Sequence, residues 1–207
     1  MQPKVYLFST SSHPDAISIN SLDITLFKPD IDFSKYDYFV ITSKQVSEVL
    51  KQYNYEFLKP ALCISKATSS SYEKIGGKVL AVGKGYGDDL AITIQKYPLS
   101  TKWLYLRARR VASNFVSTLK DNNYNIDELV VYESKCSSSI EEIKVEDNAT
   151  LIFTSPSSVQ CFLKMNTITK NARVIVIGAT TAKALPTNVD FIIAKKPTID
   201  SCIDLVT

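Results

Sequence analysis

The chain has 207 residues, of which 45% are hydrophobic, so it can form one large domain or two small ones around a proper core. Its formal net charge is only +3 and its positive residues are spread along the sequence, which does not favour nucleic acid as a partner. No apolar run approaches 18 residues and the N-terminal segment does not resemble a signal peptide. We therefore expect a cytoplasmic protein with no membrane span.

Short apolar runs alternate with segments of helical periodicity along the whole chain, which predicts a parallel α/β fold. Strands are expected at 5–8, 23–27, 37–41, 61–64, 78–82, 103–106, 128–133, 151–153, 172–177 and 191–194. Helices are expected at 43–53, 68–75, 88–96, 137–143, 159–165 and 201–206, with others ending at 119 and beginning at 182. The segment 17–22 is expected to form a truncated helix.

The cysteines and the histidine favour no metal or redox site. Cys63, Cys136, Cys161 and Cys202 are widely spaced and form no Cys-x-x-Cys motif, so we expect four reduced, mostly buried thiols. The single histidine, His13, lies in a Ser- and Pro-containing segment typical of a loop. A metal site and histidine-dependent catalysis are therefore not expected.

One strand–turn–helix pattern occurs twice. An apolar strand runs into Thr42-Ser43 in the first half and into Thr154-Ser155 in the second, and helical spacing follows each turn. A second Thr follows 26 residues after Thr42, at Thr68, and 27 residues after Thr154, at Thr181. This spacing predicts a duplicated βαβ unit, with the two copies facing a common ligand.

These turns place hydroxyl groups at the carboxyl ends of strands, beside helix N-termini. The hydroxyls can serve simply as helix N-caps. They can also form, with free backbone N–H groups, a ring of donors that binds carboxylates without a metal. The two interpretations are compatible, because a capped helix still has free N–H groups.

Two further segments are candidate anion sites. Arg107, Arg109 and Arg110 follow the strand 103–106 and belong either to a solvated helix start or to a carboxylate site. The glycine-rich segment 83–87 lacks the Gly-Lys-Ser/Thr ending of a phosphate-binding loop, and two aspartates follow it, so we expect a flexible turn.

Tyr132 ends the strand 128–133, where the first half gives way to the second. It can be an ordinary strand aromatic. A phenol with a pKa near 10 also stays protonated at neutral pH and can donate a proton in a chain with one loop histidine.

Together these residues resemble the uroporphyrinogen-III synthase family. The resemblance rests on an ordered set of short motifs over nearly the whole chain. The motifs are Ile41-Thr42-Ser43, Ala67-Thr68, Val131-Tyr132-Glu133-Ser134, Phe153-Thr154-Ser155-Pro156-Ser157 and Ile177-Gly178-Ala179-Thr180-Thr181-Ala182-Lys183-Ala184-Leu185. It implies two flavodoxin-like parallel-sheet α/β domains joined by a two-stranded β linker. The implied domains are 1–29 with 134–207, and 30–133, with linker strands near 24–28 and 129–134.

The resemblance also implies the reaction. The family cyclises hydroxymethylbilane to uroporphyrinogen III in haem biosynthesis, with inversion of ring D and loss of water, and uses no cofactor or metal. The substrate is a linear tetrapyrrole with eight carboxylates, which suits the anion-binding turns. We expect a monomer with no nucleic-acid partner, and a transient handover of substrate from hydroxymethylbilane synthase.

The family's functional positions can be carried over by motif. Tyr132 matches the active-site tyrosine, proposed to help the hydroxyl leave. Lys44 stands in place of the usual Pro, and Ser65-Lys66 in place of the usual Gly. We expect Lys44 and Lys66 to add cations for carboxylates, and Arg107 to bind the substrate as well. The positions that match the family's cleft lining are Thr42, Ser43, Thr68, Ser155, Thr180 and Thr181.

Two other functions fit the same turns. A two-domain binding module would hold an anionic small molecule without turnover. A flavodoxin-like redox domain would carry a bound flavin.

Overall fold

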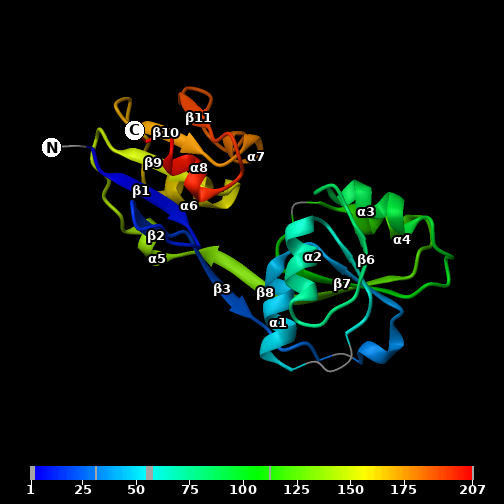
Figure 1. Ribbon diagram of the computed structural model, residues 1–207. Helices are drawn as coiled ribbons and strands as arrows, with labels where there is room; N and C mark the ends of the chain where they lie inside the picture. The colour runs from blue at the N-terminus through cyan, green and yellow to red at the C-terminus, as the bar shows by residue number, and fades with distance from the viewer. Residues whose placement is uncertain (1–2, 31, 55–57, 112, 207) are drawn as a thin grey trace. The chain divides into compact units, whose positions relative to one another are not determined.

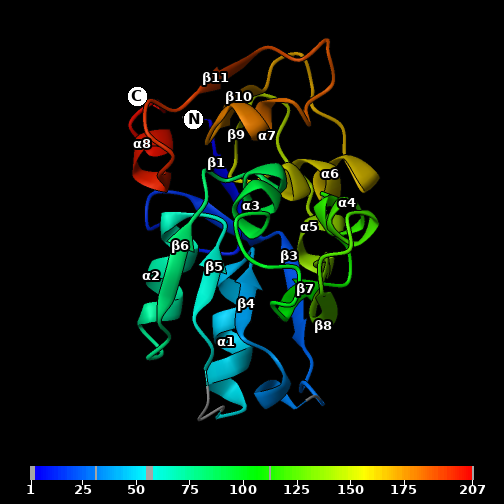
Figure 2. The same cartoon turned by 90° about the vertical axis from the view of Figure 1, so that its right-hand side faces the viewer.

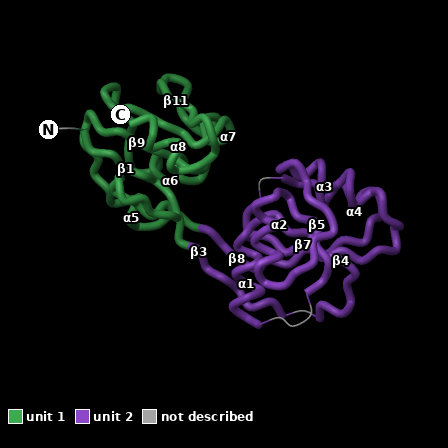
Figure 3. Tube along the Cα trace, viewed as in Figure 1, with its two compact units in different colours: residues 1–23, 135–207 green, residues 24–134 purple. Residues whose placement is uncertain are grey.

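The computed structural model describes residues 3–30, 32–54, 58–111 and 113–206, and its chain divides into two compact units (Figures 1 and 3). Unit 1 comprises residues 1–23 and 135–207, and unit 2 comprises residues 24–134. Each unit has its own sheet, of five strands in unit 1 and six in unit 2. The predicted α/β class, with two parallel-sheet bodies, is confirmed.

The sheet of unit 1 is parallel, with the order β11-β10-β9-β1-β2. Numbered along the chain, this is the flavodoxin-like order 2-1-3-4-5. Its strands are β1 (Val5–Ser9), β2 (Ile17–Asn20), β9 (Thr150–Phe153), β10 (Arg173–Val176) and β11 (Phe191–Ile193).

Alternate side chains of β1 build the two faces of this sheet. Phe8 packs with Phe153 and Phe162 on one face, and Leu7 packs with Cys202 on the other. Figure 2 shows α6 and α8 on opposite sides of unit 1. Its helices are α5 (Ser138–Glu141), α6 (Pro156–Met165), α7 (Ala179–Ala182) and α8 (Ile199–Ile203).

The sheet of unit 2 has the order β3-β8-β7-β4-β5-β6. The pairs β4–β5, β5–β6, β4–β7 and β7–β8 are parallel. Its strands are β3 (Leu22–Leu26), β4 (Tyr38–Ile41), β5 (Ala61–Cys63), β6 (Val79–Val82), β7 (Trp103–Ala108) and β8 (Ile126–Cys136), with a short 3-10 helix η1 (Phe33–Lys35) before β4.

Strands β3 and β8 carry the chain across the boundary between the units. β3 begins in unit 1 and continues in unit 2, and β8 runs back into unit 1 at its end. The two strands are neighbours in the sheet, and the N–H of Phe27 donates to the carbonyl of Val131 at 2.8 Å. Leu26-Phe27 and Val131-Tyr132 therefore run side by side.

Two helix pairs cover the sheet of unit 2. Val49 and Leu50 of α1 pack with Ile41 on one face, whereas Leu90 and Ile94 of α3 pack on the other. Successive residues of β4 alternate between these two clusters, as a strand buried on both faces requires. The helices are α1 (Lys44–Gln52), α2 (Lys66–Glu73), α3 (Gly87–Ile94) and α4 (Phe115–Asp121).

The structure corrects one predicted element. Residues 17–20 form the edge strand β2, in place of the expected truncated helix. Ile17 pairs with Tyr6 in a parallel ladder on β1. A four-residue segment gains little from one helical turn, whereas the free edge of β1 offers backbone hydrogen-bond partners along one side of all four residues.

The prediction of four reduced thiols is wrong for two of them. Cys136, at the end of β8, forms a disulfide with Cys161 of α6, with a Cα–Cα distance of 5.4 Å. Cys63 and Cys202 are free and buried. Both disulfide cysteines lie on one face of the unit 1 sheet, in the cluster around Phe162. This packing brings together two residues that are 25 positions apart in the sequence.

In the part of the chain that the structure describes, every helix falls short of the length and apolarity that a membrane crossing needs.

Candidate functional site

Both Thr-Ser turns lie where the chain reverses direction across its sheet. In unit 2, β5 and β6 follow β4 on one side, and the chain then returns to place β7 on the other side. In unit 1, β2 and β9 flank β1 in the same way. Open α/β sheets bind ligands at the carboxyl ends of strands at such a reversal. Thr42 follows β4 and Thr154 follows β9, so each unit has a predicted turn at this position.

In unit 2, the Thr42-Ser43 turn lies beside two phenols. The Thr42 hydroxyl oxygen is 3.0 Å from the Tyr105 hydroxyl oxygen on β7. The Ser43 hydroxyl N-caps α1 by accepting from the N–H of Gln45 at 3.2 Å. Ser43 is also a hydrogen-bonding neighbour of Tyr132 on β8. The turn at the end of β4 therefore contacts the neighbouring strands β7 and β8.

Both phenols are protonated at neutral pH. Burial raises the pKa of Tyr132, and its hydrogen bond with Ser43 opposes that effect. Burial likewise raises the pKa of Tyr105, against the hydrogen bond with Thr42. Tyr132 is 8% exposed and Tyr105 is 3% exposed. A buried, neutral phenol beside a cavity can act as a hydrogen-bond or proton donor.

A cavity of about 220 Å³ opens beside these phenols. Among the described residues, its lining contains one arginine and no Asp or Glu, so it suits an anionic group. The volume is below the roughly 300–1,000 Å³ of complete ligand pockets, so it fits one ring or one acid arm of a larger ligand. The lining residues are Thr42, Ile64, Gly87, Tyr105, Ala108, Arg110, Val111, Ser113, Phe115 and Tyr132.

Gly87, the last residue of the glycine-rich segment 83–87, lies in the lining of this cavity. It is the first residue of α3, and a Cβ there would clash with the Ser113 side chain and lie 3.0 Å from the Phe115 ring. A glycine at this position lets the segment 83–87 approach the cavity wall closely.

Sequence reasoning missed Tyr105 as a functional residue. Its signal is a hydroxyl-bearing aromatic near the end of a buried strand. That signal does not stand out among 11 tyrosines until the pairing of β4 with β7 brings Tyr105 to Thr42.

Arg107, predicted to bind substrate, is engaged within the protein. Its Nε atom lies 2.8 Å from Glu128 Oε2, and its Nη1 atom donates to the carbonyl of Ala108 at 3.0 Å. The side chain is 21% exposed. This arrangement fixes the end of β7 and compensates the charge of Arg107.

Lys66 and Thr68 open α2, apart from the lining of this cavity. Ser65 caps the helix, accepting from the N–H of Thr68 at 3.3 Å, and the two hydroxyl oxygens are 3.1 Å apart. Thr68 is buried, whereas Lys66, the first helical residue, is exposed. The Thr68 hydroxyl is engaged with the capping hydroxyl of Ser65, whereas Lys66 lies at an exposed position.

In unit 1, one of the predicted hydroxyls, that of Ser155, serves a helix start. Thr154 donates to the carbonyl of Phe8 at 3.1 Å, across to β1. Ser155 and Ser158 form a reciprocal capping box at the start of α6. Thr180 and Thr181 lie in α7, where Thr180 is exposed and Thr181 is buried.

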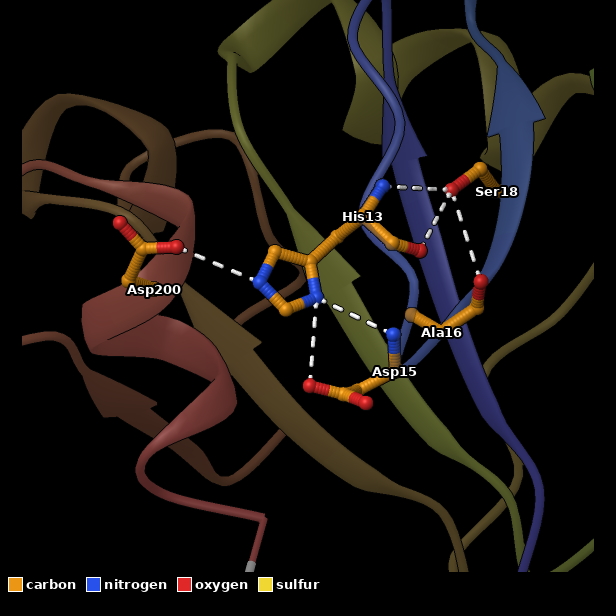
Figure 4. Close-up of polar contacts among 5 residues, drawn as sticks. All are labelled: His13, Asp15, Ala16, Ser18 and Asp200. Carbon is orange, nitrogen blue, oxygen red and sulfur yellow. Dashed lines mark hydrogen bonds and ion pairs between the residues drawn. The ribbon is translucent and has the colours of Figure 1, made fainter.

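His13 lies in the loop that follows β1 (Figure 4). Its Nε2 atom is 3.2 Å from Asp200 Oδ1 on α8, and the N–H of Asp15 donates to its Nδ1 atom at 3.2 Å. Because Nδ1 accepts this bond, the neutral ring carries its proton on Nε2 and donates it to Asp200. His13 thus ties the loop to α8. Within the described ranges, His, Cys, Asp and Glu side chains form no group of three that could hold a metal ion.

Comparisons with known proteins agree on one family. A family model described as uroporphyrinogen-III synthase HemD matches residues 16–204. The chain is similar to the crystal structure of uroporphyrinogen-III synthetase from Helicobacter pylori, with a TM-score of 0.79, 23% identity, and coverage of 98% of this chain and 97% of that one. It is also similar to a mutant uroporphyrinogen III synthase from Thermus thermophilus, with a TM-score of 0.61, 13% identity, and coverage of 97% and 96%. No curated protein sequence matches the chain.

Proposed function

The chain belongs to the uroporphyrinogen-III synthase HemD family, and we propose that it carries out the family's reaction at the strand-end turns described above. It is a cyclising lyase of haem biosynthesis that acts on hydroxymethylbilane and forms uroporphyrinogen III, with ring D inverted and water lost. The observation that carries our assignment of the site is the buried, neutral phenol of Tyr132 beside a cavity whose described lining has a cation and no acid.

We assign Tyr132 as the residue that helps the hydroxyl leave. Loss of water from the terminal carbon requires a proton on the departing hydroxyl oxygen. The phenol donates this proton, and the proton released when the macrocycle closes restores it. Burial raises the pKa of Tyr132 and so keeps the donor form populated at neutral pH.

The remaining substrate contacts need to supply only a few kcal/mol of binding free energy. Closure without an enzyme leaves ring D unturned, so the protein has to favour attack at the substituted ring-D carbon. A hundredfold preference corresponds to about 2.7 kcal/mol of differential transition-state binding. Several hydrogen bonds to carboxylates can supply it. We propose that these come from the turns that carry Thr42, Ser43, Lys66, Thr68, Ser155, Thr180 and Thr181.

We also propose that residues 1–29 with 134–207, and residues 30–133, act as two domains on the linker strands near 24–28 and 129–134. A cytoplasmic monomer that receives hydroxymethylbilane by transient handover from hydroxymethylbilane synthase fits this chemistry. The support is chemical, because a substrate that closes unaided is best transferred directly.

An isomer assay tests the function. Purified protein is incubated with hydroxymethylbilane, and the oxidised products are separated by chromatography into isomers I and III. We expect isomer III to predominate. Tetrapyrrole binding with only isomer I formed would favour the binding-module alternative, and a bound flavin would favour the redox alternative.

A further inference from the structure

Three arginines near the end of β7 have different surroundings. Arg107 is compensated by Glu128, with Nε and Oε2 2.8 Å apart. Its Nη1 atom also donates to the carbonyls of Ala108, at 3.0 Å, and Arg109, at 3.3 Å. These bonds hold the backbone of the turn that follows β7, and they leave Arg107 little capacity for a ligand.

Arg109 is also engaged. Its Nε atom lies 3.4 Å from Glu133 Oε2, and its guanidinium carbon lies 5.2 Å from the centre of the Phe27 ring. Its backbone N–H donates to the carbonyl of Tyr132 at 2.9 Å. Arg109 therefore ties the turn to β8 at the position of the proposed proton donor.

Arg110 differs from both. It lines the cavity beside Tyr105 and Tyr132, and it is the one charged residue in the described part of the lining. Among the residues that the structure describes, no acidic side chain forms an ion pair with it. An uncompensated guanidinium beside buried, neutral phenols favours an anionic ligand group.

The cavity limits what this group can be. Its volume of about 220 Å³ is too small for a tetrapyrrole but sufficient for one acid arm with its pyrrole ring. The hydroxyls of Thr42 and Ser113 also lie in its lining and can supplement the guanidinium. A carboxylate accepts two parallel N–H bonds from one arginine, which fixes its orientation as well as its position.

We propose that Arg110 binds a carboxylate arm of the substrate in this cavity, and that Arg107 and Arg109 are positioning residues that hold the turn carrying it. This assigns to Arg110 the role that the sequence suggested for Arg107. The inference rests on the proposed function, because the ligand group belongs to the family's substrate.

The test compares Arg110→Ala and Arg110→Lys with Arg173→Ala as a charge-matched control. Arg173 is exposed at the start of β10, the opposite strand end from the Thr-Ser turn of unit 1. Arg110→Ala is expected to raise KM for hydroxymethylbilane about tenfold or more, since a hydrogen-bonded charge is lost. Arg110→Lys should show a smaller increase in KM than Arg110→Ala, and Arg173→Ala should have the same KM as the unaltered protein.

A second measurement identifies the group that Arg110 binds. Hydroxymethylbilane analogues, each with one acid arm replaced by a methyl group, are assayed with the unaltered protein and with Arg110→Ala. One analogue should give the same KM with both proteins, because the carboxylate that distinguishes them is missing.

The outcomes separate the two claims. If the unaltered protein forms isomer III but Arg110→Ala behaves like Arg173→Ala, the inference is overturned and the proposed function stands. An equal loss with every analogue would also overturn it. If the unaltered protein forms only isomer I, the proposed function fails, and the inference fails with it.

Discussion

The hydroxyl oxygens of Thr42 and Tyr105 lie 3.0 Å apart, and this contact links the turn after β4 to the adjacent parallel strand β7. Ile41 of β4 is opposite Leu106 of β7, so Thr42 is the first residue beyond the paired segment. The contact forms where the chain reverses direction across the sheet, and both residues line the cavity. A bond between side chains therefore shapes the proposed substrate subsite.

Removing either hydroxyl of this pair should destabilise unit 2. We expect Tyr105→Phe and Thr42→Val each to lower the free energy of unfolding by about 1 kcal/mol, because a partly buried partner is left unsatisfied. The double variant should lose less free energy of unfolding than the sum of the losses in the two single variants. Urea unfolding of all four proteins measures this coupling. Tyr124→Phe combined with Thr42→Val is the control and should be additive, because Tyr124 bonds to Gln95 instead.

Tyr132→Phe should slow product formation about a hundredfold without abolishing it, since loss of a general acid typically costs 10²–10⁴ in rate. The residual product should still be isomer III, because the contacts that orient the substrate remain. The measurement is kcat with the isomer ratio at neutral pH. Tyr124→Phe serves as the matched control. An unchanged rate in Tyr132→Phe would remove this phenol from the mechanism.

The disulfide should stabilise unit 1. Cys136→Ser removes a crosslink between residues 25 positions apart, and the chain-entropy model gives a loss of about 3.5 kcal/mol for a loop of this size. Urea unfolding without reductant measures the loss. Thiol titration of the denatured, unreduced protein should find two free thiols, and four after reduction. The control is Cys202→Ala, which removes a free thiol. Four thiols before reduction would contradict the disulfide.

Stability should fall at alkaline pH. Burial raises the pKa of Cys202 to about 11 and that of Cys63 to about 12, from 9.0. The folded state therefore holds these protons more tightly than the unfolded state. This stability is fully present below pH 9 and is lost as the pH rises through the folded values, by up to about 1.4 kcal/mol per pH unit for each thiol.

The free energy of unfolding between pH 8 and pH 11 tests this expectation. The buried phenols of Tyr132 and Tyr105 add to the slope above pH 10, because their pKa values are also raised. Cys202→Ala should give a shallower slope than the unaltered protein in the window between pH 9 and pH 11. Parallel curves for the two proteins would contradict the assignment.

Much of the fold follows from local sequence patterns. The alternation of apolar runs with helical spacing is sufficient to predict parallel α/β architecture, because a strand buried on both faces has few polar positions. The turns at Thr42-Ser43 and Thr154-Ser155 can also be predicted from the sequence, since Ser and Thr cap helices that begin at strand ends. The edge strand β2 cannot be predicted from the sequence alone, because its four residues form a strand only by pairing with β1.

The candidate site divides in the same way. By itself the sequence determined the α/β class and the Thr-Ser turns, because these depend on residue type and near-neighbour spacing, and it singled out Tyr132 as a candidate proton donor. Only the tertiary structure decided that Tyr105 contacts Thr42 and that Cys136 forms a disulfide with Cys161. It also decided that Arg107 forms an ion pair with Glu128, whereas Arg110 lines the cavity. Strand order and helix packing determine these pairings, and both depend on contacts between residues distant in the sequence.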